Sequence, residues 1–297
     1  VAHEQETPST QHDILAPPSV RQYARSKNID LQTVQGSGEH GRITKEDVDA
    51  ALHPSTAKTQ SVAPVQQVPH GNTEQLSPIR KVIGQRMMQS LQQSAQVTFS
   101  DEADVTELVT FRAKHKEEYK KKGVKLTYLP FFVKAVCATL KQFPRFNARL
   151  DGESIVYNEQ VNIGFAADTP KGLLVPVIEN VSQKHVIDMA QEIADLATRA
   201  RDGKLVQKTQ STFTISSVGN LGGTVFTPIL NYPEVGILGI GKIQEKPVVK
   251  DGQIVVRHII TLSLTFDHQV NDGADAARFM QTLISYIEDP FSLVSVL

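Results

Sequence analysis

The stretch TFDHQVNDGADAARF (residues 265–279) contains the features that decide the fold of this chain. It ends an apolar run, RHIITLSLTFD, that predicts a strand. His268 follows the run at once, and Asp272 and Gly273 precede a run with helical spacing. Glycine lets the backbone turn sharply between the two elements. We therefore expect a strand-to-helix corner that holds His268 in a fixed place.

Shifts in composition divide the 297 residues into two folded parts and two linkers. Residues 1–13 are polar and unpatterned, and we interpret them as a linker. Residues 14–52 predict two short helices around a glycine loop, with Ser19 as the expected N-cap of the first helix. Residues 53–75 are Pro-, Ala- and Gln-rich without periodicity, which is typical of a flexible linker. Residues 76–297 mix strands and helices and predict one large α/β domain.

Charge and cysteine content exclude several classes of protein. The chain has 31 Lys and Arg against 32 Asp and Glu, so nothing favours nucleic acid or an anionic membrane as a partner. No apolar stretch reaches the roughly 20 residues of a membrane span. The single cysteine, Cys137, lies in an apolar run and predicts an inert core residue. It also fits a reducing compartment, which we take to be the bacterial cytoplasm.

The residues alone leave three interpretations of His268. It can be a structural histidine at the corner, a metal ligand, or a general base. A metal site would need more ligands, because the spacing from His268 to Asp272 supplies only two. We therefore propose no metal.

A second candidate stretch, TFTISSVGNLGG (residues 212–223), ends a predicted strand with two serines and a glycine-rich bend. Hydroxyl groups at a strand end can donate hydrogen bonds to a developing oxyanion. Ordinary strand and turn chemistry is the alternative. The spacing does not match a phosphate-binding GxxxxGKS loop.

Together these stretches resemble one family. The motif DHxxxDG (residues 267–273), with DEADVTEL, ADTPKGLLVPVI, FTISSVGNLGG and TPILNYPEVGILGIGKI, resembles the catalytic domain of dihydrolipoamide acyltransferases, the central components of 2-oxo-acid dehydrogenase complexes. PSVRQYAR and GSGEHGRITKEDV resemble that family's peripheral-subunit-binding domain. The sequences of these stretches are most similar to those of acetyltransferases of Gram-positive-type pyruvate dehydrogenase complexes. The resemblance leaves open whether the acyl group is acetyl or a branched-chain acyl group. Gln269 and Asn271 depart from the family's usual Arg and aliphatic residue.

The resemblance implies a fold and an assembly. The expected catalytic domain is a mixed sheet flanked by helices in a chloramphenicol-acetyltransferase-like trimeric core, and trimers build a cubic or icosahedral core. Each site would lie between two subunits, with His268 from one and Ser216 from the next. One or more lipoyl domains are expected upstream of Val1.

The resemblance also implies roles for single residues. His268 would take the proton of the coenzyme A thiol, Ser216 would donate to the oxyanion, and Asp272 would organise the corner. The candidates for binding coenzyme A are Arg80, Lys81, Ser217 and Asn220. Arg21, Arg25 and Arg42 would bind the decarboxylase or the dihydrolipoamide dehydrogenase. A non-catalytic scaffold and a free-standing acetyltransferase for a small acceptor are the competing functions.

Overall fold

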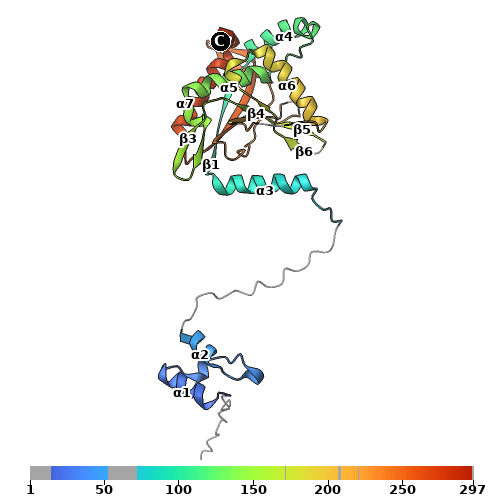
Figure 1. Cartoon of the computed structure of the whole chain (residues 1–297). Coiled ribbons are helices and arrows are strands. Elements are labelled where there is room, and N and C mark those ends of the chain that lie inside the picture. Colours follow the sequence, from blue (N-terminus) through green and yellow to red (C-terminus); the bar gives the residue numbers. More distant parts are fainter. Residues whose placement is uncertain (1–14, 53–71, 171, 207–208, 220, 296–297) are drawn as a thin grey trace, which may run out of the picture. The chain divides into compact units, whose positions relative to one another are not determined.

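The computed structural model describes residues 15–52, 72–170, 172–206, 209–219 and 221–295. They fall in two units, one within Val1–Thr73 and one within Glu74–Leu297, and each is treated by itself (Figure 1). The first is all helical and the second is a mixed sheet with flanking helices, so the expected fold class is confirmed. Within the described ranges, no helix combines the length and apolar character that a membrane span requires.

The small unit packs two helices, α1 (Pro18–Ser26) and α2 (Lys45–Leu52), around one small core. That core consists of Val20, Ala24, Ile43 and Val48. Ser19 is not the N-cap of α1, so this prediction was wrong. The cap is Pro17, and Pro18 occupies the first helical turn, where a missing N–H costs no hydrogen bond.

The glycine loop of the small unit is fastened to the start of α2. The Asp47 carboxylate accepts hydrogen bonds from the N–H groups of Ser37 (3.0 Å) and Thr44 (2.8 Å), which lower the pKa of Asp47. The Asp47 N–H donates in turn to the Thr44 hydroxyl (3.4 Å), so the expected capping pair is present. A side chain at Gly36 would collide with the Gly41 carbonyl at 2.4 Å, which explains the glycine there.

The large unit is built on a seven-stranded sheet of order β1-β11-β9-β8-β4-β7, in which β10 also pairs with β11. The strands are β1 (Gln96–Asp104), β4 (Ile163–Phe165), β7 (Val177–Ile178), β8 (Phe213–Ser217), β9 (Gly236–Ile240), β10 (Gln244–Lys250) and β11 (Gln253–Asp267). Strands β4, β8 and β9 are parallel, and the other pairs are antiparallel. The edge position of β1 agrees with its exposed acidic residue Asp101.

The helices of the large unit are α3 (Pro78–Gln93), α4 (Thr106–Lys121), α5 (Leu129–Gln142), α6 (Val186–Arg201), α7 (Gly273–Glu288) and α8 (Pro290–Ser295). All of them except α3 contribute residues to the core cluster. Two hairpins, β2 (Ala148–Asp151) with β3 (Ser154–Tyr157) and β5 (Ala167–Thr169) with β6 (Gly172–Leu174), and short 3-10 turns at Pro144–Asn147 and Val181–Gln183 complete the unit.

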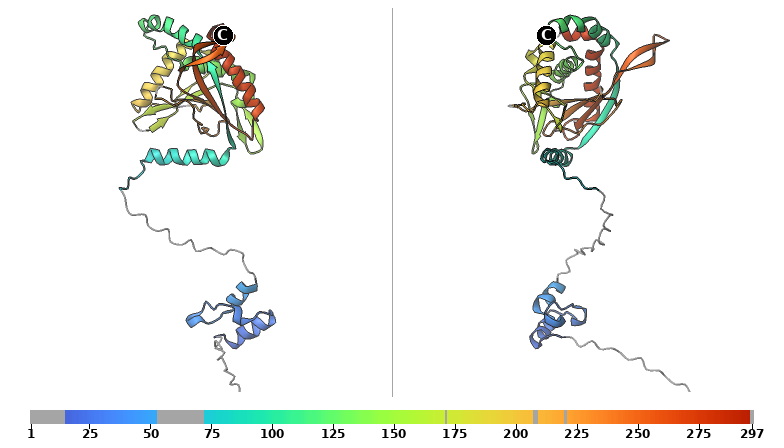
Figure 2. Two further views of the ribbon diagram at one scale, coloured as in Figure 1. Left: turned by 180° about the vertical axis from the view of Figure 1, so that it is seen from behind. Right: turned by 90° about the vertical axis from the view of Figure 1, so that its right-hand side faces the viewer.

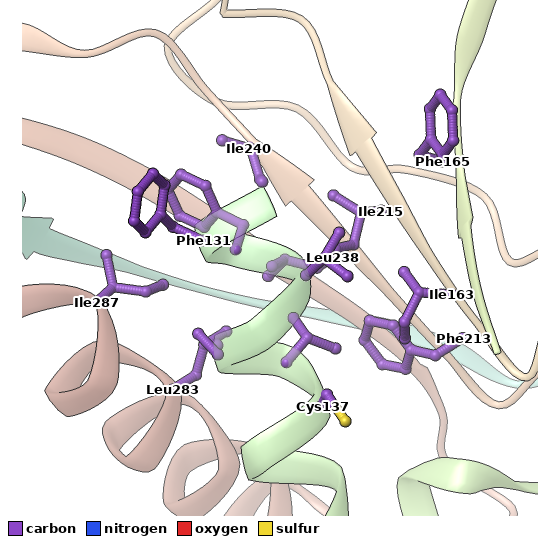
Figure 3. Close-up of a cluster of buried hydrophobic side chains, with 14 of the residues drawn as sticks. Phe131, Cys137, Ile163, Phe165, Phe213, Ile215, Leu238, Ile240, Leu283 and Ile287 are labelled. Atoms are coloured by element: carbon purple, nitrogen blue, oxygen red, sulfur yellow. The ribbon is translucent and has the colours of Figure 1, made fainter. Parts of the chain in front are cut away.

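Helix α5 lies at the centre of this core and is buried on almost every side, as its continuous apolar run predicts. Figure 3 shows its residues Phe131 and Cys137 among side chains from β4, β8, β9 and α7. Cys137 is buried there, with its sulfur 3.4 Å from the Ser182 hydroxyl. The expectation that Cys137 is a core residue is therefore confirmed.

Strand β11 is the longest strand, and its two halves have different surroundings. Its first half forms a hairpin with β10 through Asp251 and Gly252, both at positive φ, as an Asp-Gly turn requires (Figure 2). Its second half, from Ile259 to Asp267, is buried throughout. A buried half-strand can hold its last residue rigidly, and that residue precedes His268.

We predict that Gly236→Ala destabilises the large unit. Its new methyl group would meet Cε2 of Phe213 at 2.6 Å, and that ring is fully buried and stacked on Phe279. Overpacking of this kind costs about 1–3 kcal/mol. The midpoint of thermal unfolding measures this loss of stability. Gly84→Ala is the control, because a methyl group there meets nothing within 4 Å. A Gly236→Ala midpoint equal to that of the control would contradict the packing described.

Candidate active site

His268 stands immediately after β11 and is exposed to solvent. Its backbone N–H donates to the Ala95 carbonyl at 2.8 Å, and its ring lies 5.9 Å from the ring of Phe266. Among the described residues, no side chain or backbone group bonds to the imidazole itself. The backbone is thus held, while the ring nitrogens stay available to a reacting molecule.

The Asp267 carboxylate clamps this corner. It is only 3% exposed, and its Oδ1 accepts from the N–H groups of Ala95 (3.1 Å) and Gln269 (3.0 Å). The Gln269 amide adds bonds of 3.2 and 3.3 Å to the two carboxylate oxygens and reaches the Gln93 carbonyl at 3.0 Å. Through these bonds, Asp267 and its neighbour Gln269 tie the end of β11 to the junction of α3 and β1.

Asp272 begins α7 as its N-cap. Its Oδ1 accepts from the N–H groups of Ala274 (2.8 Å) and Asp275 (3.0 Å), and the Asp272 N–H donates to the Asp275 carboxylate (3.2 Å). This bond, with help from Arg278, lowers the pKa of Asp275. The reciprocal cap fixes the direction in which the chain leaves His268. In this structure Asp272 therefore organises the corner through the backbone.

Ser216 lies near the end of β8 on the face of the sheet that the helices leave uncovered. Side chains alternate along a strand, and the neighbours Phe213 and Ile215 belong to the helix-covered core. Ser216 pairs with Gly239 of β9, and hydroxyl groups follow on the same face in β11 and β1. Ser263 of β11 accepts from Ser100 (3.0 Å), and Thr265 bonds Thr98 (2.7 Å). Ser216 thus belongs to a hydroxyl-lined face.

The structure does not bring Ser216 and His268 of one chain together. Ser216 pairs with Gly239 of β9, which pairs with Ser263 of β11. From Ser263 to the strand end at Asp267 is about 14 Å, and two strand spacings of about 4.8 Å separate β8 from β11. The two side chains therefore lie more than about 15 Å apart, too far for one reacting centre to touch both.

The other candidate residues lie in different places. Ser217 is exposed at the end of β8, and Asn220 falls outside the described residues. Arg80 and Lys81 are exposed on the first turn of α3. The far end of α3 contacts Gln269 through Gln93, so about 20 Å of helix separates the two cations from His268. Within one chain they do not contact the corner.

In the small unit, Arg21, Arg25 and Arg42 are exposed. Arg21 and Arg25 occupy successive turns of α1, and Nε of Arg21 donates to the Ala16 carbonyl (3.0 Å). Arg42 lies in the loop that Asp47 fastens to α2. Lys27 and Lys45 add positive charge around the Tyr23 ring, at 5.9 and 5.7 Å from its centre. The unit therefore presents several cations on a rigid scaffold.

Sequence reasoning missed one buried acid beside the corner, Glu234. It precedes β9 in the run NYPEVGILGIG, and it is 4% exposed. Burial raises its pKa to about 7 in spite of three hydrogen bonds to its side chain. An acidic residue directly before an entirely apolar strand was the available signal. In the described ranges, no cluster of three or more His, Cys, Asp or Glu side chains could hold a metal ion.

Comparisons with known proteins agree with this organisation. Residues 69–295 match the family model for 2-oxoacid dehydrogenases acyltransferase (catalytic domain), and residues 14–49 match the E3 binding domain. The chain is 42% identical over 299 residues to the dihydrolipoyllysine-residue acetyltransferase component of pyruvate dehydrogenase complex from Bacillus subtilis. That match covers 93% of this chain and 67% of the relative.

Two solved structures are similar to the large unit. One comes from crystallographic and enzymatic work on a serine, a histidine and an asparagine in the catalytic mechanism of Azotobacter vinelandii dihydrolipoamide acetyltransferase, at 43% identity and TM-score 0.73. The other is the cubic core of the pyruvate dehydrogenase multienzyme complex, at 43% identity and TM-score 0.74. Each covers 78% of this chain and 98% of the other. The Azotobacter residues have the same spacing along their chain as Ser216, His268 and Asp272 here.

We predict that Asn271→Leu raises the stability of the large unit. Asn271 is 2% exposed, its amide makes one long bond to the Arg145 carbonyl (3.4 Å), and its Oδ1 has no partner in the described part of the chain. Removal of such an orphaned buried group gains about 1 kcal/mol. Asn147→Leu is the matched control and should destabilise, because the Asn147 amide makes bonds of 3.0 and 3.2 Å. Unfolding midpoints test both, and a lower midpoint for Asn271→Leu would refute the prediction.

Proposed function

This chain belongs to the 2-oxoacid dehydrogenase acyltransferase family, and on that premise we propose that it transfers an acetyl group from a dihydrolipoyl thioester to coenzyme A. The observation that carries the proposal is His268, held by its backbone at a clamped strand end with its imidazole exposed. A non-catalytic scaffold would not require that arrangement. The relative from Bacillus subtilis supports acetyl as the acyl group.

The first step of the proposed reaction is a proton transfer. A thiol with a pKa of about 8.5 is mostly protonated at neutral pH and reacts slowly as a nucleophile. His268 in its neutral form takes the proton of the coenzyme A thiol while the sulfur attacks the thioester carbonyl. The C–S bond to the lipoyl group then breaks, and His268 returns the proton to the departing sulfur. Atoms and charge balance without a metal or an oxidant.

Ser216 is the proposed donor to the oxyanion of the tetrahedral intermediate. Such a donor is worth about 3 kcal/mol where water is excluded. The equal spacing of the serine, histidine and asparagine in the Azotobacter enzyme supports Ser216, His268 and Asp272 as the corresponding group. The third position differs, because a carboxylate stands here where that enzyme has an amide. Arg80, Lys81, Ser217 and Asn220 remain proposed contacts for coenzyme A.

We further propose that the site is shared between two copies of the chain in a homotrimer. The separation of Ser216 and His268 within one chain supports this, since no internal contact could join them. The β10–β11 hairpin also presents Val249, Ile254 and Val256 at 69–78% exposure, and an apolar face of that kind favours contact with protein. The similar cubic core is consistent with trimers that assemble further.

The small unit is the proposed docking site for peripheral enzymes. Its match to the E3 binding domain supports dihydrolipoamide dehydrogenase as one partner, and the decarboxylase is the other. Arg21, Arg25 and Arg42 would meet an acidic surface on that partner. Electrostatic contacts of this kind form quickly and weaken as salt is added.

We predict that His268→Ala slows acetyl transfer between acetyl-coenzyme A and dihydrolipoamide by about 100-fold to 10,000-fold, the usual contribution of a positioned general base. The purified assemblies should have the same size. His185→Ala is the matched control, because that histidine is exposed and its side chain makes no capping bond. Equal rates for His268→Ala and wild type would contradict the base role of His268, and the absence of transfer in both would favour the scaffold function.

A further inference from the structure

Glu234 sits at the centre of a hydrogen-bond network that sequence motifs do not reveal. Its Oε1 accepts from the hydroxyls of Ser211 and Thr214 (3.0 Å) and from the Asn231 amide (2.7 Å). Its Oε2 has no partner among the described residues, although the atom is buried. A buried carboxyl with one fully used and one unused oxygen is costly when ionised. Packing alone therefore does not explain why a carboxyl group is buried at position 234.

The network fixes the loop of residues 230–235 on three sides. Glu234 holds it to the start of β8 through Ser211 and Thr214. Leu230 holds it to the end of α3, because its carbonyl accepts from Ser90 (2.6 Å) and its N–H donates to the Gln96 side chain (3.0 Å). The loop is thus a bridge between β8 and the α3–β1 junction.

The third side of the loop reaches the catalytic corner directly. The Val235 carbonyl, one residue after Glu234, accepts from the Asp267 N–H at 3.1 Å. Ala95, which lies between the loop contacts Ser90 and Gln96, bonds Asp267 and His268. The path from the Glu234 carboxyl to the backbone of His268 is therefore continuous and short.

The charged and titratable groups around Glu234 are few. Arg86 of α3 and Tyr232 line the same cavity of about 290 Å³ with Glu234, while Asp267 and His268 stand at the end of β11. Strand β8 contributes only hydroxyls. No described cation lies within ion-pair distance of Glu234, so only the three hydrogen bonds to its side chain oppose the desolvation, and the pKa still rises to about 7. The neutral acid and the carboxylate both exist near neutral pH.

We propose that Glu234 is a positioning residue for His268: its carboxyl, in the neutral form, locks the 230–235 loop on β8 and so sets the place of the β11 end. Ionisation puts a charge in the site that these hydrogen bonds offset only in part, and it loosens the loop. The proposal rests on the role given to His268 above. Glu234 touches no reacting atom and acts only through Val235, Asp267 and the backbone of His268.

The raised pKa of Glu234 determines the direction in which the stability of the folded chain changes with pH. The folded-state pKa of Glu234, about 7, lies above the ordinary value of 4.5, so the folded chain holds this proton more tightly than the unfolded chain. The stability that Glu234 contributes is therefore complete below about pH 4.5 and is lost as the pH rises to about 7. Glu234→Gln stays neutral at every pH and should remove this loss. Glu159→Gln, an exposed glutamate, is the matched control and should behave as wild type.

The first test is the pH profile of acetyl transfer from about pH 5 to about pH 9. In wild type and in Glu159→Gln we expect kcat to fall as the pH rises through about 7, because Glu234 ionises there. Glu234→Gln should lose the falling limb and keep KM. Glu234→Ala should lower kcat about tenfold or more at all pH values, because it breaks three bonds at a buried group. A Glu234→Gln profile that keeps the falling limb would overturn the proposal.

A second readout does not depend on activity. Diethyl pyrocarbonate modifies accessible imidazoles, and peptide mass spectrometry gives the rate at His268 with His40 of the small unit as internal reference. We expect Glu234→Ala to change the His268 rate several-fold relative to His40 in assemblies of unchanged size. An unchanged ratio would refute the positioning role. If His268→Ala were fully active while the ratio still moved in Glu234→Ala, the proposed base role of His268 would fail and the positioning contact would stand.

Discussion

The Asp267 carboxylate is the interaction on which the catalytic geometry depends. It is buried at the end of the longest strand and is satisfied by neutral donors from Ala95 and Gln269. Those bonds join the end of β11 to α3 and β1, and they leave the next residue, His268, outside the core but fixed at its backbone. The Asp272 cap then turns the chain into α7. Because the backbone of His268 is already fixed, only the side-chain torsions of the imidazole remain to be ordered when a substrate arrives.

The same constraint underlies the proposal that two copies of the chain share each site. A rigid strand end cannot bend back toward β8, so His268 stays more than about 15 Å from Ser216. The exposed apolar face of the β10–β11 hairpin suits contact with another copy. A site shared in the proposed way would make acyl transfer depend on assembly, and it would couple the catalytic and structural roles proposed for this domain.

Patterns among neighbouring residues made much of this structure predictable. Contacts between residues that are far apart in the sequence could not be predicted from such patterns. The strand that ends at His268, the buried helix α5 and the Thr44–Asp47 cap follow from neighbouring residues. Ser19 was misplaced because two prolines compete with it at the helix start. The distance between Ser216 and His268 requires the strand order, which sequence spacing does not contain. Glu234 was missed because its burial depends on β8, α3 and a loop that are far apart in the sequence.

Subunit complementation tests the shared site most directly. Ser216→Ala and His268→Ala chains would be unfolded together, mixed in equal amounts and reassembled, and acetyl transfer would be compared with each variant reassembled alone. If one copy supplies the histidine and another the serine, random mixing in a trimer restores about one quarter of the wild-type activity. A mixture no more active than the mean of its two parents would contradict the account, because it would place both residues of each site on one chain.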